Sequence, residues 1–152
     1  MQTDILTVSP ETSILDVHRM FVEEEIHGAP VVDDDGAVRG VVSTLDLLRA
    51  VSEDAEPARS AYFHADRWLV PERLPDRNDE LVAADIMTRE LVAVPPDMPI
   101  AEVAQLLREQ HVHRVLVIEN GELLGVLTTF DLLRAFVDER PAQVLRAVDR
   151  TA

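Results

Sequence analysis

The sequence contains no cysteine, which excludes disulfide bonds, thiolate metal sites and cysteine nucleophiles. It also contains no lysine, so all 14 basic residues are arginine. The acidic residues are more than twice as numerous, at 29. The resulting net charge of −15 repels nucleic acid and anionic lipid. The composition therefore argues against DNA, RNA and membrane partners.

Long apolar runs are missing as well. No stretch approaches the roughly 18 consecutive apolar residues of a membrane span, and the N-terminus shows no signal-peptide pattern. The chain has 152 residues, of which 47% are hydrophobic, and this suffices for one compact core. We therefore expect a soluble, cytoplasmic, single-domain protein.

The sequence does contain an internal repeat. Val8-Ser9-Pro10 recurs as Val94-Pro95-Pro96, and the correspondence continues until Asp131 matches Asp46, with one residue lost from the second turn. In this alignment 17 of 49 residue pairs are identical, and 12 of the others exchange one apolar residue for another. The chain is therefore predicted to contain two copies of one structural unit.

Each copy is predicted to fold as β-α-β-β-α. Apolar runs closed by proline predict strands, and apolar residues at helical spacing predict helices. Ser13 with Asp16 is a capping pair, and Asn120-Gly121 favours a tight turn. The predicted elements of the two copies are strands at 5–8 and 91–94, helices from 14 and 100, hairpins at 30–42 and 115–127, and closing helices at 45–51 and 130–137.

The two copies should pack together, because a unit of about 50 residues buries little apolar surface alone. The predicted organisation is repeat 1 at 1–51, an insert at 52–84, repeat 2 at 85–137 and a C-terminal helical tail at 138–152. The insert carries three of the six aromatic residues, which are Tyr62, Phe63 and Trp68. It either folds back on the core or forms a lid or a dimer contact.

The junction between the second hairpin strand and the closing helix has the same polar pattern in both copies. It reads Gly-Val-Val-Ser-Thr-Leu-Asp at 40–46 and Gly-Val-Leu-Thr-Thr-Phe-Asp at 125–131. The glycine allows a ligand or another backbone to approach closely. The hydroxyl lies at the start of a helix, where free backbone N–H groups favour an anion. The carboxylate is suited to accept hydrogen bonds from the adjacent hydroxyls of a ribose.

A second interpretation needs no ligand. Ser43 and Thr128 would cap the helices, and the helix dipole would favour Asp46 and Asp131. Recurrence of the whole pattern at the same place in both copies favours the ligand-binding interpretation.

On these residues, and on the preceding strands His27-Gly-Ala-Pro-Val-Val and His113-Arg-Val-Leu-Val, the repeat resembles the CBS motif, named for cystathionine β-synthase. Two motifs in tandem look like a Bateman module. The resemblance implies an α/β (α+β) fold in which two pseudo-two-fold-related repeats pack through their sheets. It implies two clefts that bind AMP, ADP, ATP or S-adenosylmethionine, with no cofactor required.

The resemblance also implies roles for individual residues. The aspartates would bind ribose, the hydroxyl, histidine and arginine side chains would contact phosphate, and the remaining residues would enclose the base. One cleft would use Thr128, Asp131, His113 and Arg114, completed by Thr7, Ile26 and His27. The other would use Ser43 and Asp46, completed by Ala93, Val112 and His113.

The two predicted clefts are not equivalent, because Gly28 stands where the second copy has Arg114. Arginine offers a forked donor for phosphate. We expect phosphate binding at Thr128 and Asp131, and a weaker or less anionic ligand at Ser43 and Asp46.

The sequence thus predicts a regulatory, ligand-sensing module that forms a homodimer and acts on a separate protein or on a second copy of itself. The alternative is an interaction or dimerisation module with vestigial sites. An enzyme is disfavoured, because the chain has no Walker loop, no Ser/His/Asp spacing and no paired catalytic carboxylates. A metal site is also disfavoured, because no carboxylate pattern completes His111 and His113.

Overall fold

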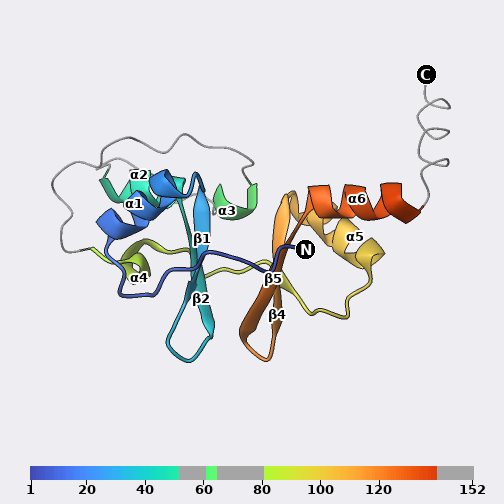
Figure 1. The fold of residues 1–152 in the computed structure, drawn as a ribbon, viewed down its shortest axis with the longest axis horizontal. Coiled ribbons are helices and arrows are strands. Elements are labelled where there is room, and N and C mark those ends of the chain that lie inside the picture. Colours follow the sequence, from blue (N-terminus) through green and yellow to red (C-terminus); the bar gives the residue numbers. More distant parts are fainter. Residues whose placement is uncertain (52–60, 65–80, 140–152) are drawn as a thin grey trace, which may run out of the picture.

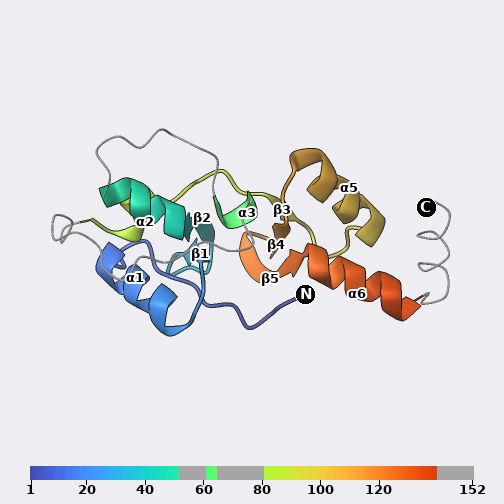
Figure 2. The ribbon, with the colours of Figure 1, turned by 90° about the horizontal axis from the view of Figure 1, so that it is seen from above.

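The computed structural model describes residues 1–51, 61–64 and 81–139. Two halves stand side by side, and the hairpins β1–β2 and β4–β5 face each other between them (Figure 1). Viewed from above, α1 and α2 lie at one end, α5 and α6 at the other, and α3 between them (Figure 2). The elements are α1 (Ile14–Glu23), β1 (Gly28–Val32), β2 (Val38–Ser43), α2 (Thr44–Val51), α3 (Ala61–His64), α4 (Ala83–Ile86), β3 (Ala93–Val94), α5 (Ile100–Gln110), β4 (Arg114–Glu119), β5 (Glu122–Thr128) and α6 (Thr129–Glu139).

Local sequence signals place most of these elements correctly. Ser13 caps α1, since its hydroxyl oxygen accepts a hydrogen bond of 3.1 Å from the backbone N–H of Asp16. The tight turn between β4 and β5 is confirmed by the positive φ angles of Asn120 and Gly121, 53° and 88°. The predicted class, a mixed helix and strand fold of two repeats, is confirmed.

The first predicted strand of each copy is shorter than expected. In repeat 1, Val8 forms a single parallel bridge to Val31. In repeat 2, only Ala93–Val94 forms a strand, parallel to β4. The residues before each short pairing contact the other repeat, since Gln2 pairs with β5 and Thr88 pairs with β2. They are therefore not available to lengthen the strand in their own repeat.

The two repeats exchange their first residues. Gln2 pairs with Val126 of β5 through two backbone hydrogen bonds of 2.9 Å, and Thr88 pairs with Val41 of β2 in the same way. The start of each repeat therefore extends the sheet of the other.

This exchange explains the glycine in each polar junction. A Cβ atom at Gly40 would lie 2.7 Å from the carbonyl oxygen of Thr88, and one at Gly125 would lie 2.8 Å from that of Gln2. Both distances are too short for a side chain. Of the two uses expected for these glycines, the structure shows the close approach of another backbone.

The core is divided between the repeats. One cluster lies mainly in repeat 1, where it centres on Ile14, Val17 and Phe21 of α1, and it extends to α4. The other lies mainly in repeat 2 and includes Tyr62 and Phe63 of α3. The insert thus folds back on the core at 61–64, while Trp68 and the tail beyond residue 139 lie outside the described residues. Within the described ranges, no helix is long and apolar enough to span a membrane.

Candidate ligand site

The junction between β5 and α6 fixes the Asp131 carboxylate at the start of a helix. Oδ2 of Asp131 accepts hydrogen bonds from the backbone N–H of Thr128, at 2.9 Å, and from its hydroxyl, at 3.0 Å. Oδ1 lies 3.1 Å from the amino group of Met1, and the side chain of Asp131 is 19% exposed. We call Thr128, Asp131 and the adjoining Arg114 the Asp131 site.

The junction between β2 and α2 repeats this arrangement in a more buried form. Oδ2 of Asp46 accepts hydrogen bonds of 2.7 Å from both the backbone N–H and the hydroxyl of Ser43. Oδ1 lies 3.9 Å from Arg49, the side chain of Thr88 is near enough to act on the pKa of Asp46, and the Asp46 side chain is only 4% exposed. We call Ser43 and Asp46 the Asp46 site.

The surroundings shift the pKa values of the Asp46 and Asp131 carboxyl groups in opposite directions. Burial is the largest influence on Asp46 and raises its pKa, although hydrogen bonds from Ser43 oppose it. Burial also acts on Asp131, but hydrogen bonds from Thr128 and the Met1 amino group prevail and lower its pKa. Asp131 is therefore the more readily ionised acceptor.

Arg114 and Gly28 hold equivalent positions beside the two sites. Arg114 is the strand partner of Thr128, and Gly28 is the partner of Ser43. The guanidinium carbon of Arg114 lies 5.2 Å from the centre of the Tyr62 ring, within the range of a cation–π contact. Burial of the Tyr62 hydroxyl raises its pKa to about 12.

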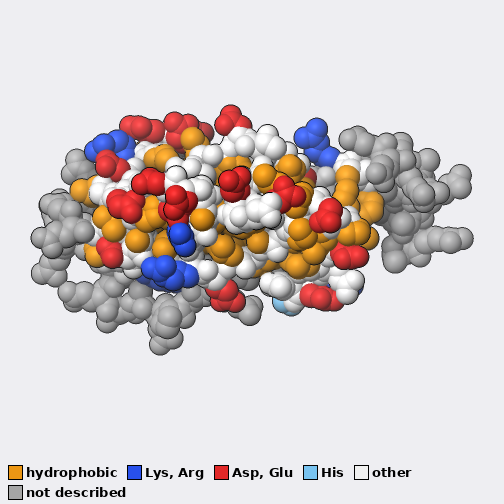
Figure 3. Space-filling view, turned by 90° about the horizontal axis from the view of Figure 1, so that it is seen from below, with side chains coloured by type: hydrophobic (Ala, Val, Ile, Leu, Met, Phe, Trp, Pro, Cys, Tyr) orange, Lys and Arg blue, Asp and Glu red, His pale blue; other side chains and the backbone are white. Residues whose placement is uncertain are grey.

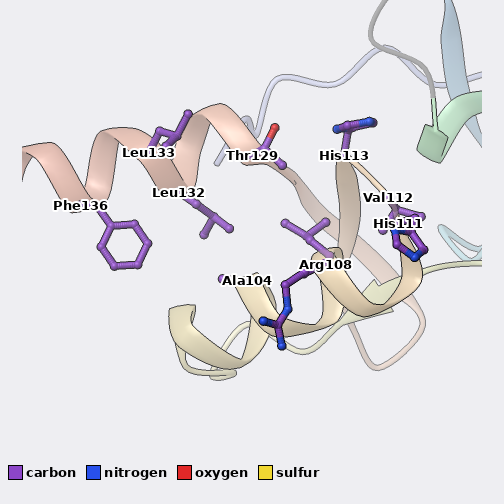
Figure 4. Close-up of a pocket in the computed structure, with 10 residues that line it drawn as sticks. Ala104, Arg108, His111, Val112, His113, Thr129, Leu132, Leu133 and Phe136 are labelled. Atoms are coloured by element: carbon purple, nitrogen blue, oxygen red, sulfur yellow. The ribbon is translucent and has the colours of Figure 1, made fainter. Parts of the chain in front are cut away.

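The two histidines predicted to contact phosphate form backbone hydrogen bonds to the first residues of the closing helices. The carbonyl of His113 accepts a hydrogen bond of 3.0 Å from Thr129, and the carbonyl of His27 accepts one of 3.0 Å from Thr44. The side chain of His113 lines a pocket of about 560 Å³ between α5 and α6 (Figure 4). The side chains of His113 and Arg114 therefore lie in different surroundings, His113 at this pocket and Arg114 beside the Tyr62 ring.

The remaining predicted residues are more scattered. Thr7 lines a separate pocket of about 290 Å³ near the hairpin tips. Val112 is buried in the repeat 2 core, and Ile26 packs against the repeat 1 core. Ala93 is exposed on β3. The structure brings together Ser43 with Asp46, and Thr128 with Asp131 and Arg114, while Thr7 lies apart from both sites.

Two residues at these sites were not found by the sequence reasoning. Thr88 reaches Asp46 from the start of repeat 2, and Tyr62 reaches Arg114 from the insert. The only sequence signal for either was a glycine at a close approach, Gly40 for Thr88 and Gly28 for Tyr62. In the part of the chain that the structure describes, no group of three or more His, Cys, Asp or Glu side chains could hold a metal ion.

Two β-α-β-β-α repeats that exchange their first residues, each with a hydroxyl–carboxylate pair at the start of its closing helix, define a tandem-repeat module of mixed α and β structure. The CBS domain model matches residues 1–53 and 82–138. The chain belongs to the CBS domain family.

Relatives of similar architecture occur in archaea and plants. The chain is 27% identical to the uncharacterized protein MJ1426 of Methanocaldococcus jannaschii, across 87% of this chain and 86% of that protein. It is 30% identical to the chloroplastic CBS domain-containing protein CBSX1 of Arabidopsis thaliana, with 98% of this chain aligned but only 64% of CBSX1.

Solved structures agree with the fold. The crystal structure of CBSX2 in complex with AMP matches with a TM-score of 0.66 and 26% identity, over 92% of this chain and 94% of that one. The CBS domain pair of MJ0100, solved with 5-methylthioadenosine and S-adenosyl-L-methionine, matches with a TM-score of 0.63 and 18% identity, over 92% and 94% of the two chains.

Proposed function

We propose that this chain is a regulatory module that senses an adenosine-containing ligand bound at the Asp131 site. The observation that carries the proposal is the Asp131 carboxylate, which Thr128 fixes at the start of α6 with its pKa lowered and its side chain partly exposed. The CBSX2 structure supports the choice of ligand, because that relative was solved with AMP.

Each part of the site fits one part of such a ligand. Carboxylate oxygens only accept hydrogen bonds, and they suit the paired hydroxyls of a ribose. Arg114 lies next to Thr128 across the β4–β5 ladder and supplies a forked donor for phosphate. Acidic side chains are spread over the face of the molecule seen from below (Figure 3), and the net charge is −15. A ligand with one or two phosphates, or cationic S-adenosylmethionine, meets less repulsion than free ATP.

Sensing requires that the ligand prefer one arrangement of the protein. A ligand shifts a conformational equilibrium only by its difference in affinity for the two states. The Asp131 site lies at the start of α6, directly after β5, and Gln2 of repeat 1 pairs with this strand. Binding there would therefore favour one packing of the two repeats, or of two chains, and a separate protein would respond to it.

Calorimetric titration of ligand-stripped protein with AMP, ADP, Mg-ATP and S-adenosylmethionine tests the proposal. Asp131→Asn should weaken binding by about 100-fold, since it removes charge-assisted hydrogen bonds to the ribose. Asp97→Asn, the same change at an exposed loop carboxylate, should leave binding unchanged. Absence of heat with all four ligands up to about millimolar concentration would reject the sensor function and favour an unliganded interaction module.

A homodimer is the second part of the proposal, and the surface of α6 supports it. Phe130, Leu133 and Val137 recur at helical spacing and are 74%, 58% and 51% exposed. They continue the apolar pocket between α5 and α6, which Phe136 also lines (Figure 4). Apolar area of this kind on one helix face is typical of an interface between two copies of a chain.

Sedimentation analysis tests this part. The paired change Phe130→Asp and Leu133→Asp should convert a dimer into a monomer, because it places charges in the apolar contact. Leu15→Asp and Val22→Asp, made together at exposed apolar positions of α1, are the matched control and should leave the dimer intact. A wild-type chain that sediments as a monomer would contradict the proposal.

A further inference from the structure

The insert places two aromatic side chains beside the Asp46 site. Tyr62 is 5% exposed and Phe63 is 2% exposed, and their rings meet edge to face with centroids 5.1 Å apart. Their helix, α3, contacts β2, α2 and β4, which are the strand that ends at Ser43, the helix that carries Asp46 and the strand that follows His113. α3 therefore contacts elements of both repeats around one site.

Gly28 shows how closely Tyr62 approaches. Gly28 is the strand partner of Ser43, and a Cβ atom built on it would lie 2.6 Å from Cδ2 of Tyr62. Any side chain at this position would displace the ring. The absence of a side chain at Gly28, which from the sequence looks like the loss of a phosphate-binding residue, makes room for Tyr62.

Phe63 links α3 to the segment that leads into β4. Its carbonyl accepts a hydrogen bond of 2.8 Å from the backbone N–H of His113. Its ring belongs to the same buried cluster as Val112 and Val41. Val112 and His113 are residues that the resemblance to the CBS motif assigned to the Asp46 cleft. In this structure the backbone of His113 and the side-chain cluster of Val112 are both engaged by Phe63.

The polar groups of the Asp46 site are also engaged within the protein. Oδ2 of Asp46 accepts two hydrogen bonds from Ser43, and Oδ1 faces Arg49. The Asp46 side chain is 4% exposed, against 19% for Asp131. The hydrogen-bond partners of the two aspartates are similar, so the difference for a ribose lies in the deeper burial of Asp46 and in the aromatic ring next to it.

We propose that Tyr62, packed against Phe63, is a built-in occupant of the Asp46 site, so that each chain binds one adenosine-type ligand, at the Asp131 site. The statement about ligand number rests on the function proposed above, whereas the occupancy by Tyr62 does not. Aromatic rings of the chain take the place of a purine base here, and the insert thereby sets the stoichiometry of binding.

Titration with AMP at protein concentrations well above the dissociation constant measures that stoichiometry. Wild-type protein should bind one AMP per chain, and Tyr62→Ala should bind two. Tyr62→Phe, which keeps the ring, is the matched control and should bind one. Adding Asp46→Asn to Tyr62→Ala should return the number to one. Two AMP per wild-type chain, or one AMP per chain in a folded Tyr62→Ala variant, would overturn the inference.

A measurement on the wild-type chain separates occupancy from ligand binding and does not depend on a variant that folds. Tyr62 is the single tyrosine of the sequence, so nitration with tetranitromethane reports on this residue alone. Nitration should be at least tenfold slower in native than in urea-unfolded protein. Equal rates would overturn the occupancy. Slow nitration without AMP binding by any variant would leave the occupancy standing and reject the proposed ligand function.

Discussion

The two repeats share a sequence pattern and a set of local hydrogen bonds, yet they differ in what surrounds them. Ser43 with Asp46, and Thr128 with Asp131, form the same reciprocal contacts at the start of a helix. Asp46 is enclosed by Thr88 and by the neighbouring α3, while Asp131 keeps part of its surface exposed. The repeated residues set the local geometry, and the segments that are not repeated decide its accessibility.

The helices show the same contrast. Ile14 at the start of α1 is fully buried, and its N–H donates a hydrogen bond to the carbonyl of Leu81, in the segment that leads into α4. Ile100, at the matching position of α5, is 45% exposed. Phe130 is 74% exposed on α6, whereas Leu45 at the matching position of α2 is half-buried. At these matching positions the side chains of repeat 1 are covered by the chain itself, while those of repeat 2 stay exposed.

The largest expected effect separates the structural roles of the two aspartates. Asp46→Ala leaves the buried N–H and hydroxyl of Ser43 without their acceptor and should lower the free energy of unfolding by about 2–3 kcal/mol. Asp131→Ala should cost about 1 kcal/mol or less, since water can reach Thr128. Urea denaturation of the two variants measures both values. Equal costs would show that the burial difference has no energetic consequence.

The next effect concerns the side chain that the first repeat lacks. Arg114→Ala should weaken AMP binding by about tenfold through the loss of one charge-assisted contact to phosphate. Adenosine, which has no phosphate, should bind both proteins with similar affinity. Calorimetry with the two ligands measures the difference, and an equal loss for adenosine would show that Arg114 acts through packing on Tyr62.

A smaller effect distinguishes the first helices of the repeats. α1 has a side-chain cap from Ser13, whereas the N-cap residue of α5 is Pro99, which makes no such hydrogen bond. Ser13→Ala should lower the free energy of unfolding by about 1 kcal/mol. Thermal unfolding by circular dichroism provides the measurement, with Ser9→Ala as a comparison outside the helix. A Ser13→Ala variant as stable as the wild type would mean that tertiary contacts alone hold this helix start.

The smallest effect is a difference in acid response. The pKa of Asp131 is lowered in the folded state, so its contribution to stability is present above the unfolded pKa and is lost as the pH falls through the folded one. The pKa of Asp46 is raised, so stability instead decreases as the pH rises from the unfolded value through the folded one. Asp131→Asn should therefore reduce the loss of stability between about pH 5 and pH 3, and Asp46→Asn should increase it.

Urea midpoints at the two pH values measure this response. Asp97→Asn, a change at an exposed carboxylate, serves as the reference. Shifts of the same sign in the Asp46 and Asp131 variants would contradict the opposite directions that the two environments impose.

The sequence predicted whatever depends on neighbouring residues along the chain. The Ser13 cap, the Asn120-Gly121 turn and the two hydroxyl–carboxylate junctions each involve residues only a few positions apart, so their pattern is visible in the sequence. The repeat itself led to the fold class. These features follow from short-range hydrogen bonds and from apolar periodicity.

The sequence did not reveal the contacts between distant segments. Pairing of Gln2 with Val126, or of Thr88 with Val41, leaves no periodic signal, because each is a single bridge between segments far apart in the chain. Tyr62 in the insert has no counterpart in the repeat pattern. The glycines that admit these contacts were visible, but a glycine indicates a close approach without naming the atom that approaches.

The exchange of first residues has a mechanical consequence. Each repeat holds the other by paired backbone hydrogen bonds, and in both cases the strand that is held continues directly into a closing helix. A rotation of one repeat therefore applies force to the backbone of the other, along the strand that leads to its carboxylate. We expect the two repeats to move together, because a displacement of β5 or β2 also displaces the chain start of the other repeat that is paired with it.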